Sequence, residues 1–329
     1  MSQPVGTAGL RYPVLLERQV VRPEAWADPS QPSDIDLASL LEEPCRPVAL
    51  ESLVPVVDHT AHDWNPMWKS PEEISYLSSR TGGVDRVYIA GRRRPLFRLG
   101  EALSACWSPD GSRLYCLVSS RRRSELRQIG PAADEVARLE TGGFQFREVR
   151  CTPDGARLLL AGAGGLYALD LSSGGLEGLA GGGLSRPAIS PDGRRVSFVD
   201  RGQAILELDL GTRRSRELHR AEFRVGPLAY SADGRHLLFL QEEAGDAAGL
   251  YALDRHGGGP WLVVPGHFRN LAVGALPQDP ESRRSRAMLY QLLLGSPEER
   301  EPKPTIERLG EDRVRIGGIV LPRRRLEAA

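Results

Sequence analysis

Two observations in the sequence predict an all-β protein of the propeller class. The first is a turn motif, Ser/Thr-Pro-Asp-Gly or a close variant, which begins at residues 70, 108, 152, 190 and 231, so that successive copies are 38, 44, 38 and 41 residues apart. The second is that short apolar segments flank the copies. A period of this length with four short strands per repeat is typical of one blade of a β-propeller.

The residue types of the motif suit a tight turn between two strands. In Ser108-Pro109-Asp110-Gly111, the proline presets φ at the first central position of the turn. The aspartate tolerates the bridge-region backbone conformation of the second central position, and the glycine adopts the left-handed conformation that closes the hairpin. The aspartates of these turns are therefore predicted to be structural and not catalytic.

Each turn is followed by three apolar segments of strand length. "RLYCLVS", "RLLLAG", "RVSFVD" and "HLLFLQ" come directly after turns, a second group such as "LYALDL" (166–171) follows, and a third such as "SRELH" (215–219) precedes the next repeat. Short apolar runs are expected of strands packed on both faces. The five copies predict propeller blades at about 62–100, 101–140, 141–180, 181–219 and 220–264.

The repeats resemble those of the TolB-type, WD-like propeller family. "CWSPDGSRLYCLV" and "LYALD" before a Gly-rich turn carry the resemblance, which covers about residues 62–264 in five copies. The last copy, 271–309, loses the turn motif to an Arg-rich insertion, but six blades are usual in this family. The resemblance therefore implies a six-bladed β-propeller whose last blade spans about 265–320, followed by a tail at 321–329. The resemblance implies the fold and a tendency to bind other proteins. We do not expect the signal peptide or the α/β domain that TolB carries before its propeller. We also do not expect the hydrolase domain with a G-x-S-x-G motif that peptidases with a similar propeller carry.

The first 61 residues lie outside the repeats and are predicted to form an N-terminal arm. Its prolines favour an extended chain, and Ser33 with Asp36 suits the cap of a short helix over 34–43, whose apolar stripe consists of Leu37, Leu40 and Leu41. The arm either folds back on its own propeller or docks on a partner. The strand-like segments 48–57 and 312–322 are alternative candidates to complete the last blade.

Composition limits the classes of function. The 43 basic and 43 acidic residues give no formal net charge, which argues against a general nucleic-acid or anionic-membrane binder. No segment approaches the length of a membrane span. The four cysteines, at 45, 106, 116 and 151, lack the spacing of a metal site and are predicted to be buried free thiols. A bacterial protein of the reducing cytoplasm, with no cofactor, is expected.

Aromatic and basic residues recur where innermost strands are expected to begin. Three Phe-Arg pairs and a tryptophan occupy these connectors, which gather on one face of a propeller. Either the phenylalanines pack between blades and the arginines are solvated, or the residues form a rim for an acidic peptide or small anion. The candidate rim residues are Trp64, Phe146, Arg147, Phe223, Arg224, Phe268 and Arg269.

No residues suggest a catalytic site. The segment "DHTAHDW" offers His59, His62 and Asp63 as weak metal candidates, but their spacing matches no strong site, so no metal is predicted. The expected function is a non-catalytic protein–protein interaction module or assembly scaffold, which uses the propeller face and the N-terminal arm. The alternatives are a propeller enzyme of the lyase or lactonase type, or a binder of small anions in the central channel.

Overall fold

The computed structural model describes residues 13–19, 33–39, 54–57, 62–70, 73–80, 84–92, 94–120, 123–130, 135–139, 144–182, 184–242, 248–274, 306–308, 313–316 and 319–322. All regular elements in these segments are β-strands. They include no helix long and apolar enough to cross a membrane. The chain divides into two compact units, residues 1–276 and 277–329.

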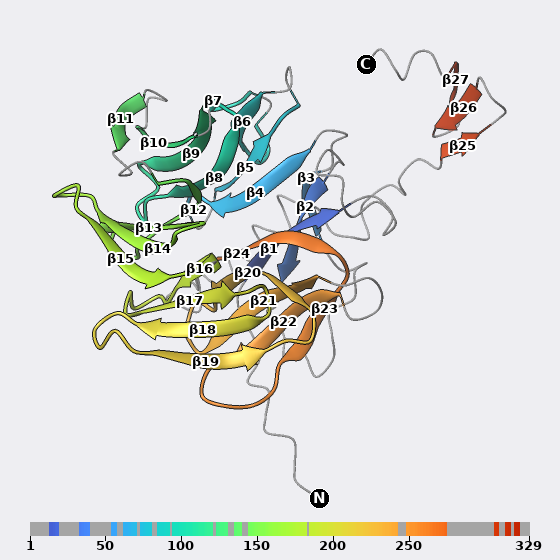
Figure 1. Cartoon of the computed structure of the whole chain (residues 1–329). Helices are drawn as coiled ribbons and strands as arrows, with labels where there is room; N and C mark the ends of the chain where they lie inside the picture. The colour runs from blue at the N-terminus through green and yellow to red at the C-terminus, as the bar shows by residue number, and fades with distance from the viewer. Residues whose placement is uncertain are drawn as a thin grey trace, which may run out of the picture. The chain divides into compact units, whose positions relative to one another are not determined.

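In the first unit, five sheets are each built from four consecutive antiparallel strands (Figure 1). The first strand of each sheet is the innermost one. The sheets consist of β4 (Asp63–Trp68), β5 (Ile74–Ser78), β6 (Asp85–Ile89) and β7 (Phe97–Gly100); β8 (Ala102–Trp107), β9 (Leu114–Ser120), β10 (Arg123–Ile129) and β11 (Glu135–Leu139); β12 (Phe146–Cys151), β13 (Arg157–Gly162), β14 (Gly165–Asp170) and β15 (Leu176–Gly181); β16 (Leu184–Ile189), β17 (Arg195–Asp200), β18 (Ala204–Asp209) and β19 (Ser215–Arg220); and β20 (Arg224–Tyr230), β21 (His236–Glu242), β22 (Gly249–Asp254) and β23 (Trp261–Pro265).

A further four-stranded sheet combines the two ends of this unit. Strand β24 (Phe268–Val273) pairs with β1 (Pro13–Gln19), which pairs with β2 (Ser33–Ser39), and β2 pairs with β3 (Val54–Val57). Val14, Leu15 and Leu16 of β1 are completely buried. Burial of apolar side chains on both faces of β1 explains why this segment enters the sheet.

The predicted helix over 34–43 is wrong, because Ser33–Ser39 is a strand in which Leu37 pairs with Leu15. The segment reads "SDIDLAS", with apolar residues at 35 and 37, and this period of two suits a strand better than a helix. Pairing with the buried β1 therefore outweighs the capping signal at Ser33. Leu40 and Leu41 lie outside the described residues.

The described strands of the predicted blade over 265–320 are divided between the two units and do not form one sheet. Of these strands, β24 belongs to the first unit, and the N-terminal strands supply its partners. The segment 48–57 contributes β3 at the outer edge of this composite sheet. In the second unit, β25 (Ile306–Arg308), β26 (Arg313–Ile316) and β27 (Ile319–Pro322) form a three-stranded sheet of their own.

Innermost strands of neighbouring sheets contact each other around the unit. The contacts run from β4 to β8, β12, β16, β20 and β24 in turn, and β24 contacts β4. In the described part of the chain, five apolar clusters lie between adjacent sheets, and one of them contains Leu16 together with Leu238 and Leu240. Because each sheet is covered on both faces by its neighbours, apolar residues predominate in its second strand, as in β13 with RLLLAG.

The four turns that carry Asp-Gly share one set of hydrogen bonds. At the first of them, Gly111 N–H donates to Ser108 O over 2.9 Å, and Asp110 Oδ1 accepts a hydrogen bond from Ser112 N–H over 3.0 Å. The hydrogen bond from the Ser108 hydroxyl, with those from Ser112, lowers the pKa of Asp110 to about 2. The four glycines have φ between 67° and 70°. The turn aspartates are thus structural, as predicted.

Candidate binding site

A cavity of about 320 Å³ lies among the innermost strands. Its lining comes from the second halves of β4, β8, β12, β16, β20 and β24, for example Trp107 at the end of β8 and Ile189 at the end of β16. Because the later residues of every innermost strand meet at one cavity, these strands run in the same direction. The cavity is therefore a section of the central channel.

Every innermost strand is irregular near its start. The register with the next strand shifts at Trp64/Met67, Ala102/Ser104, Phe146/Glu148, Ser185/Ala188 and Val225/Leu228, and β24 skips a residue against β1. Such bulges re-aim side chains and occur preferentially near binding sites.

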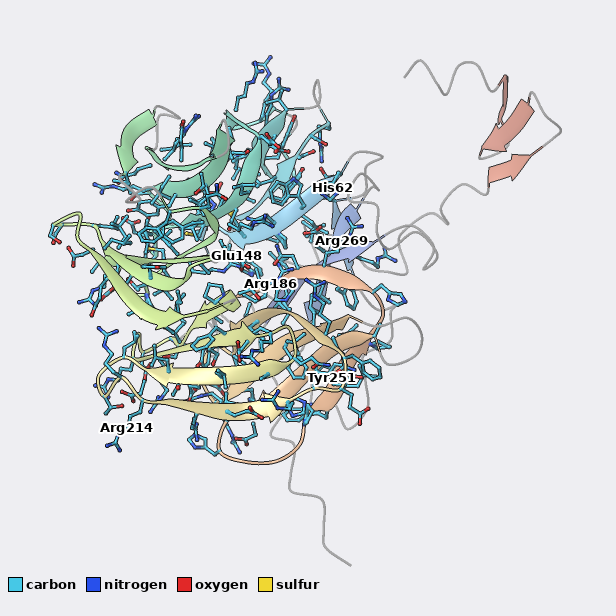
Figure 2. All side chains as sticks on the ribbon, viewed as in Figure 1. His62, Glu148, Arg186, Arg214, Tyr251 and Arg269 are labelled. Atoms are coloured by element: carbon cyan, nitrogen blue, oxygen red, sulfur yellow. The ribbon has the colours of Figure 1, made fainter. Side chains whose placement is uncertain are left out.

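Two of the bulges hold a non-glycine residue in the left-handed region. Asn65 has φ +50° and Arg186 has φ +59°. In both cases, a carboxylate of the neighbouring sheet accepts a hydrogen bond from the backbone N–H: Glu17 Oε2 from Asn65 and Glu148 Oε1 from Arg186, each over 3.1 Å. Figure 2 shows Glu148 and Arg186 near the middle of the first unit. These bonds offset the strain of left-handed backbone at residues with a side chain.

The predicted rim arginines lie at the starts of innermost strands. Arg147 is the second residue of β12, Arg224 is the first of β20, and Arg269 is the second of β24. Arg147 and Arg224 are exposed, and Arg269 is half-buried. Arg269 occupies the bulge of β24.

The aromatic part of the predicted rim needs correction. Phe146 and Phe268 are 2% and 4% exposed, because each packs in an apolar cluster between two sheets. Trp64 is half-buried against another such cluster, and Phe223 is also half-buried. Phe146 and Phe268 thus belong to the core and cannot serve as stacking surfaces for a partner.

The weak metal candidates are engaged in other contacts. Both carboxylate oxygens of the buried Asp63 accept hydrogen bonds from Arg80 Nη2 over 2.8 Å, and His62 stacks on Trp64 with ring centroids 6.1 Å apart. His59 lies outside the described residues. Within the described segments, no three His, Cys, Asp or Glu side chains lie close enough to hold a metal ion.

An ionic network centred on the buried Glu207 lies between the fourth and fifth blades. Glu207 Oε2 accepts hydrogen bonds from Arg255 Nε over 2.6 Å and from Tyr230 Oη over 3.0 Å, and Glu207 Oε1 accepts from Arg216 Nη2 over 2.8 Å. Burial raises the pKa of Glu207, but the hydrogen bonds and charges of the two arginines outweigh it and leave that pKa below its usual value. The hydrogen bond to Glu207 fixes the side chain of Tyr230, which is one of the residues that line the cavity.

No sequence pattern pointed to Arg150, which lines the cavity, or to Asn65, Arg186 and the Glu207 network. One usable signal was an X-Pro pair three or four residues before the turn serine, at Pro66, Pro187 and Pro227. Proline cannot donate to a ladder, so within strands it marks bulges and edges. The recurrence of this pair could have placed the bulges of three innermost strands.

Known proteins resemble this chain in structure but not in sequence. No protein-family model and no curated protein matches the sequence. The crystal structure of TolB from Acinetobacter baumannii is similar with a TM-score of 0.65 and 19% identity, over 83% of this chain and 68% of that one. The structure of a putative TolB from Agrobacterium tumefaciens has a TM-score of 0.55 and 18% identity, over 69% of this chain and 95% of that one.

A third similar chain comes from the crystal structure of a nidogen/laminin complex, with a TM-score of 0.62 and 10% identity over 80% of this chain and 98% of that one. At such low identities, the similarity is one of fold and carries no function. The predicted all-β propeller is confirmed, and the chain has a β-propeller fold of the TolB type.

Proposed function

We propose that the protein is a non-catalytic protein–protein interaction module, which binds its partner where the innermost strands begin. The observation that carries this proposal is the exposed basic groups at the bulged starts of these strands, Arg147 and Arg224 above all. Arginine is enriched at interface hot spots because its guanidinium forms bidentate hydrogen bonds with carboxylates. The partner surface is accordingly an acidic one.

The common direction of the innermost strands supports one shared surface. Their second halves line one cavity, so their first residues lie toward the opposite mouth of the channel. Rigid propellers are used widely as platforms, and one similar propeller comes from a nidogen/laminin complex.

A charge-matched pair of triple variants tests this function. Arg147, Arg224 and Arg269 are replaced by alanine in one protein, and the exposed Arg113, Arg194 and Arg214 in the other. With purified partner identified by pull-down from native extract, the first triple variant should bind more weakly by about 1.5–3 kcal/mol for each buried charge-assisted hydrogen bond that is lost. The control triple should bind normally. Equal affinity of the two variants contradicts the proposed surface.

The proposal includes a closed ring of six blades, in which the composite sheet is the sixth. The pairing of β24 with β1 and the contacts of β24 with β20 and β4 support it. Deletion of residues 1–45 removes β1 and β2 and leaves β24 without its partner, so it should lower the melting temperature and weaken partner retention. A deletion that changes neither property would contradict the closed ring.

We also propose a reducing cytoplasmic location. Cys106, Cys116 and Cys151 are free thiols in the structure. Burial raises the pKa of all three, and that of Cys151 to about 12, so they remain protonated and unreactive near neutral pH. The location is checked by fusing a reactive tag to the protein and treating intact cells with a membrane-impermeant reagent for that tag. A cytoplasmic protein should be labelled only after the cells are lysed.

A further inference from the structure

The channel cavity has an unusual distribution of charge. Most of its lining is apolar, and its neutral polar groups include the amides of Asn65 and Asn270 and the thiols of Cys106 and Cys151. Arg150 is the one charged side chain among the described lining residues, and they include no aspartate or glutamate. The cavity thus contains a guanidinium without a carboxylate.

Neutral groups hold this guanidinium in place. Arg150 Nη1 donates to Val149 O over 2.9 Å and to Ser104 Oγ over 3.4 Å. Among the described residues, no hydrogen bond of Nε or Nη2 is found, and no ion pair involves Arg150. The side chain is half-buried, and its positive charge opposes the burial-driven rise in the pKa of the neighbouring Cys106 thiol.

Two other arginines that are withdrawn from solvent, the half-buried Arg80 and the buried Arg255, are neutralised by carboxylates. Arg80 donates to both oxygens of Asp63, and Arg255 donates to Glu207. Withdrawing a charge from water is costly unless a partner compensates it. Arg150 differs from these two residues because the described structure supplies no counter-charge for it.

We propose that the channel cavity binds a small organic monocarboxylate, with the carboxylate on Arg150 and the apolar body against the surrounding strand residues. The planar guanidinium suits the two oxygens of a carboxylate. A single cation matches a single negative charge. Met67, Trp107, Ile189 and Leu271 offer apolar surface, and a volume of about 320 Å³ limits the ligand to a small molecule.

The test uses the full chain with hexanoate as the probe and hexanamide as its neutral analogue of equal length. Isothermal titration should give saturable binding of hexanoate, and hexanamide should bind at least tenfold more weakly. Because a free acid and a peptide C-terminus present the same group, N-acetyl-leucine is titrated in parallel, and the tighter of the two acids identifies the source of the carboxylate.

Variants of Arg150 separate a ligand contact from a structural role. Arg150→Gln should weaken hexanoate binding about ten- to a hundredfold, the loss expected for a hydrogen bond to a charged group. Arg150→Lys keeps the charge and should retain part of the preference for the acid. Arg157→Gln, which removes an exposed arginine from the neighbouring β13, should bind like the unmodified protein.

A cavity-filling variant locates the site. Ala188 lines the cavity and is 5% exposed, so Ala188→Leu occupies part of the space and should abolish binding while Arg150 remains. The proposal is overturned by any of four results: no saturable hexanoate binding up to 10 mM, equal binding of acid and amide, unchanged binding in Arg150→Gln, or unchanged binding in Ala188→Leu.

Discussion

Truncation of Leu16 tests whether β1 is an integral part of the propeller. Its side chain is completely buried in the same apolar cluster as Leu238 and Leu240 of β21. Leu16→Ala removes three carbon atoms from this cluster and leaves a cavity, which costs about 2–5 kcal/mol in a well-packed core. The free energy of unfolding should fall by that amount.

The size of the loss depends on how firmly β1 is docked. If the N-terminal strands detach before the rest of the unit unfolds, the loss cannot exceed the free energy of docking, because a detached strand no longer contributes. Leu240→Ala is the matched control: Leu240 is 1% exposed in the same cluster but belongs to a blade of consecutive strands.

Urea unfolding followed by tryptophan fluorescence measures both variants against the unmodified protein. Similar losses in the two variants indicate that the composite sheet unfolds together with the blades. A change below about 0.5 kcal/mol in Leu16→Ala, beside a loss of about 2–5 kcal/mol in Leu240→Ala, refutes the reasoning.

Three further predictions concern the turns, the buried network and pH. Gly111→Ala should destabilise more than Gly155→Ala in thermal unfolding: both glycines have positive φ, but a Cβ at Gly111 would lie 2.3 Å from the backbone oxygen of Lys69, whereas at Gly155 its nearest contact is 3.4 Å. Equal losses would contradict the clash. Glu207→Gln should lower the unfolding free energy by about 3–5 kcal/mol, because Arg255 stays buried without its counter-charge. Glu177→Gln, which removes the exposed partner of Arg213, should cost less than about 1 kcal/mol; similar costs would show that the Glu207 pair is not special. Burial lowers the pKa of His236 below its usual value of about 6.5, so its stabilising contribution is present above about pH 6.5 and is lost as the pH falls through the folded-state pKa. His236→Phe should therefore flatten the fall in melting temperature between pH 7 and pH 5, and an unchanged slope would exclude this histidine as its source.

The repeats of the sequence determined the strands and turns of the five consecutive blades. In "SPDG" turns, proline, aspartate and glycine each satisfy a local backbone requirement, and this is why Gly111 has the left-handed φ that the motif predicts. Apolar runs such as "RLLLAG" indicate burial on both faces. These properties depend on residues close together in the chain, so sequence alone reveals them.

Only the tertiary structure decided how the ends and the channel are built. The segment 33–39 carries both a helix cap and a period of two, and its pairing with the buried β1 selects the strand. Phe146 and Arg147 are neighbours in sequence, but the first is buried between sheets and the second is exposed. The cavity around Arg150 gathers residues from strands between residues 63 and 273, and which charges meet there depends on the closure of those strands around one axis and not on any local pattern.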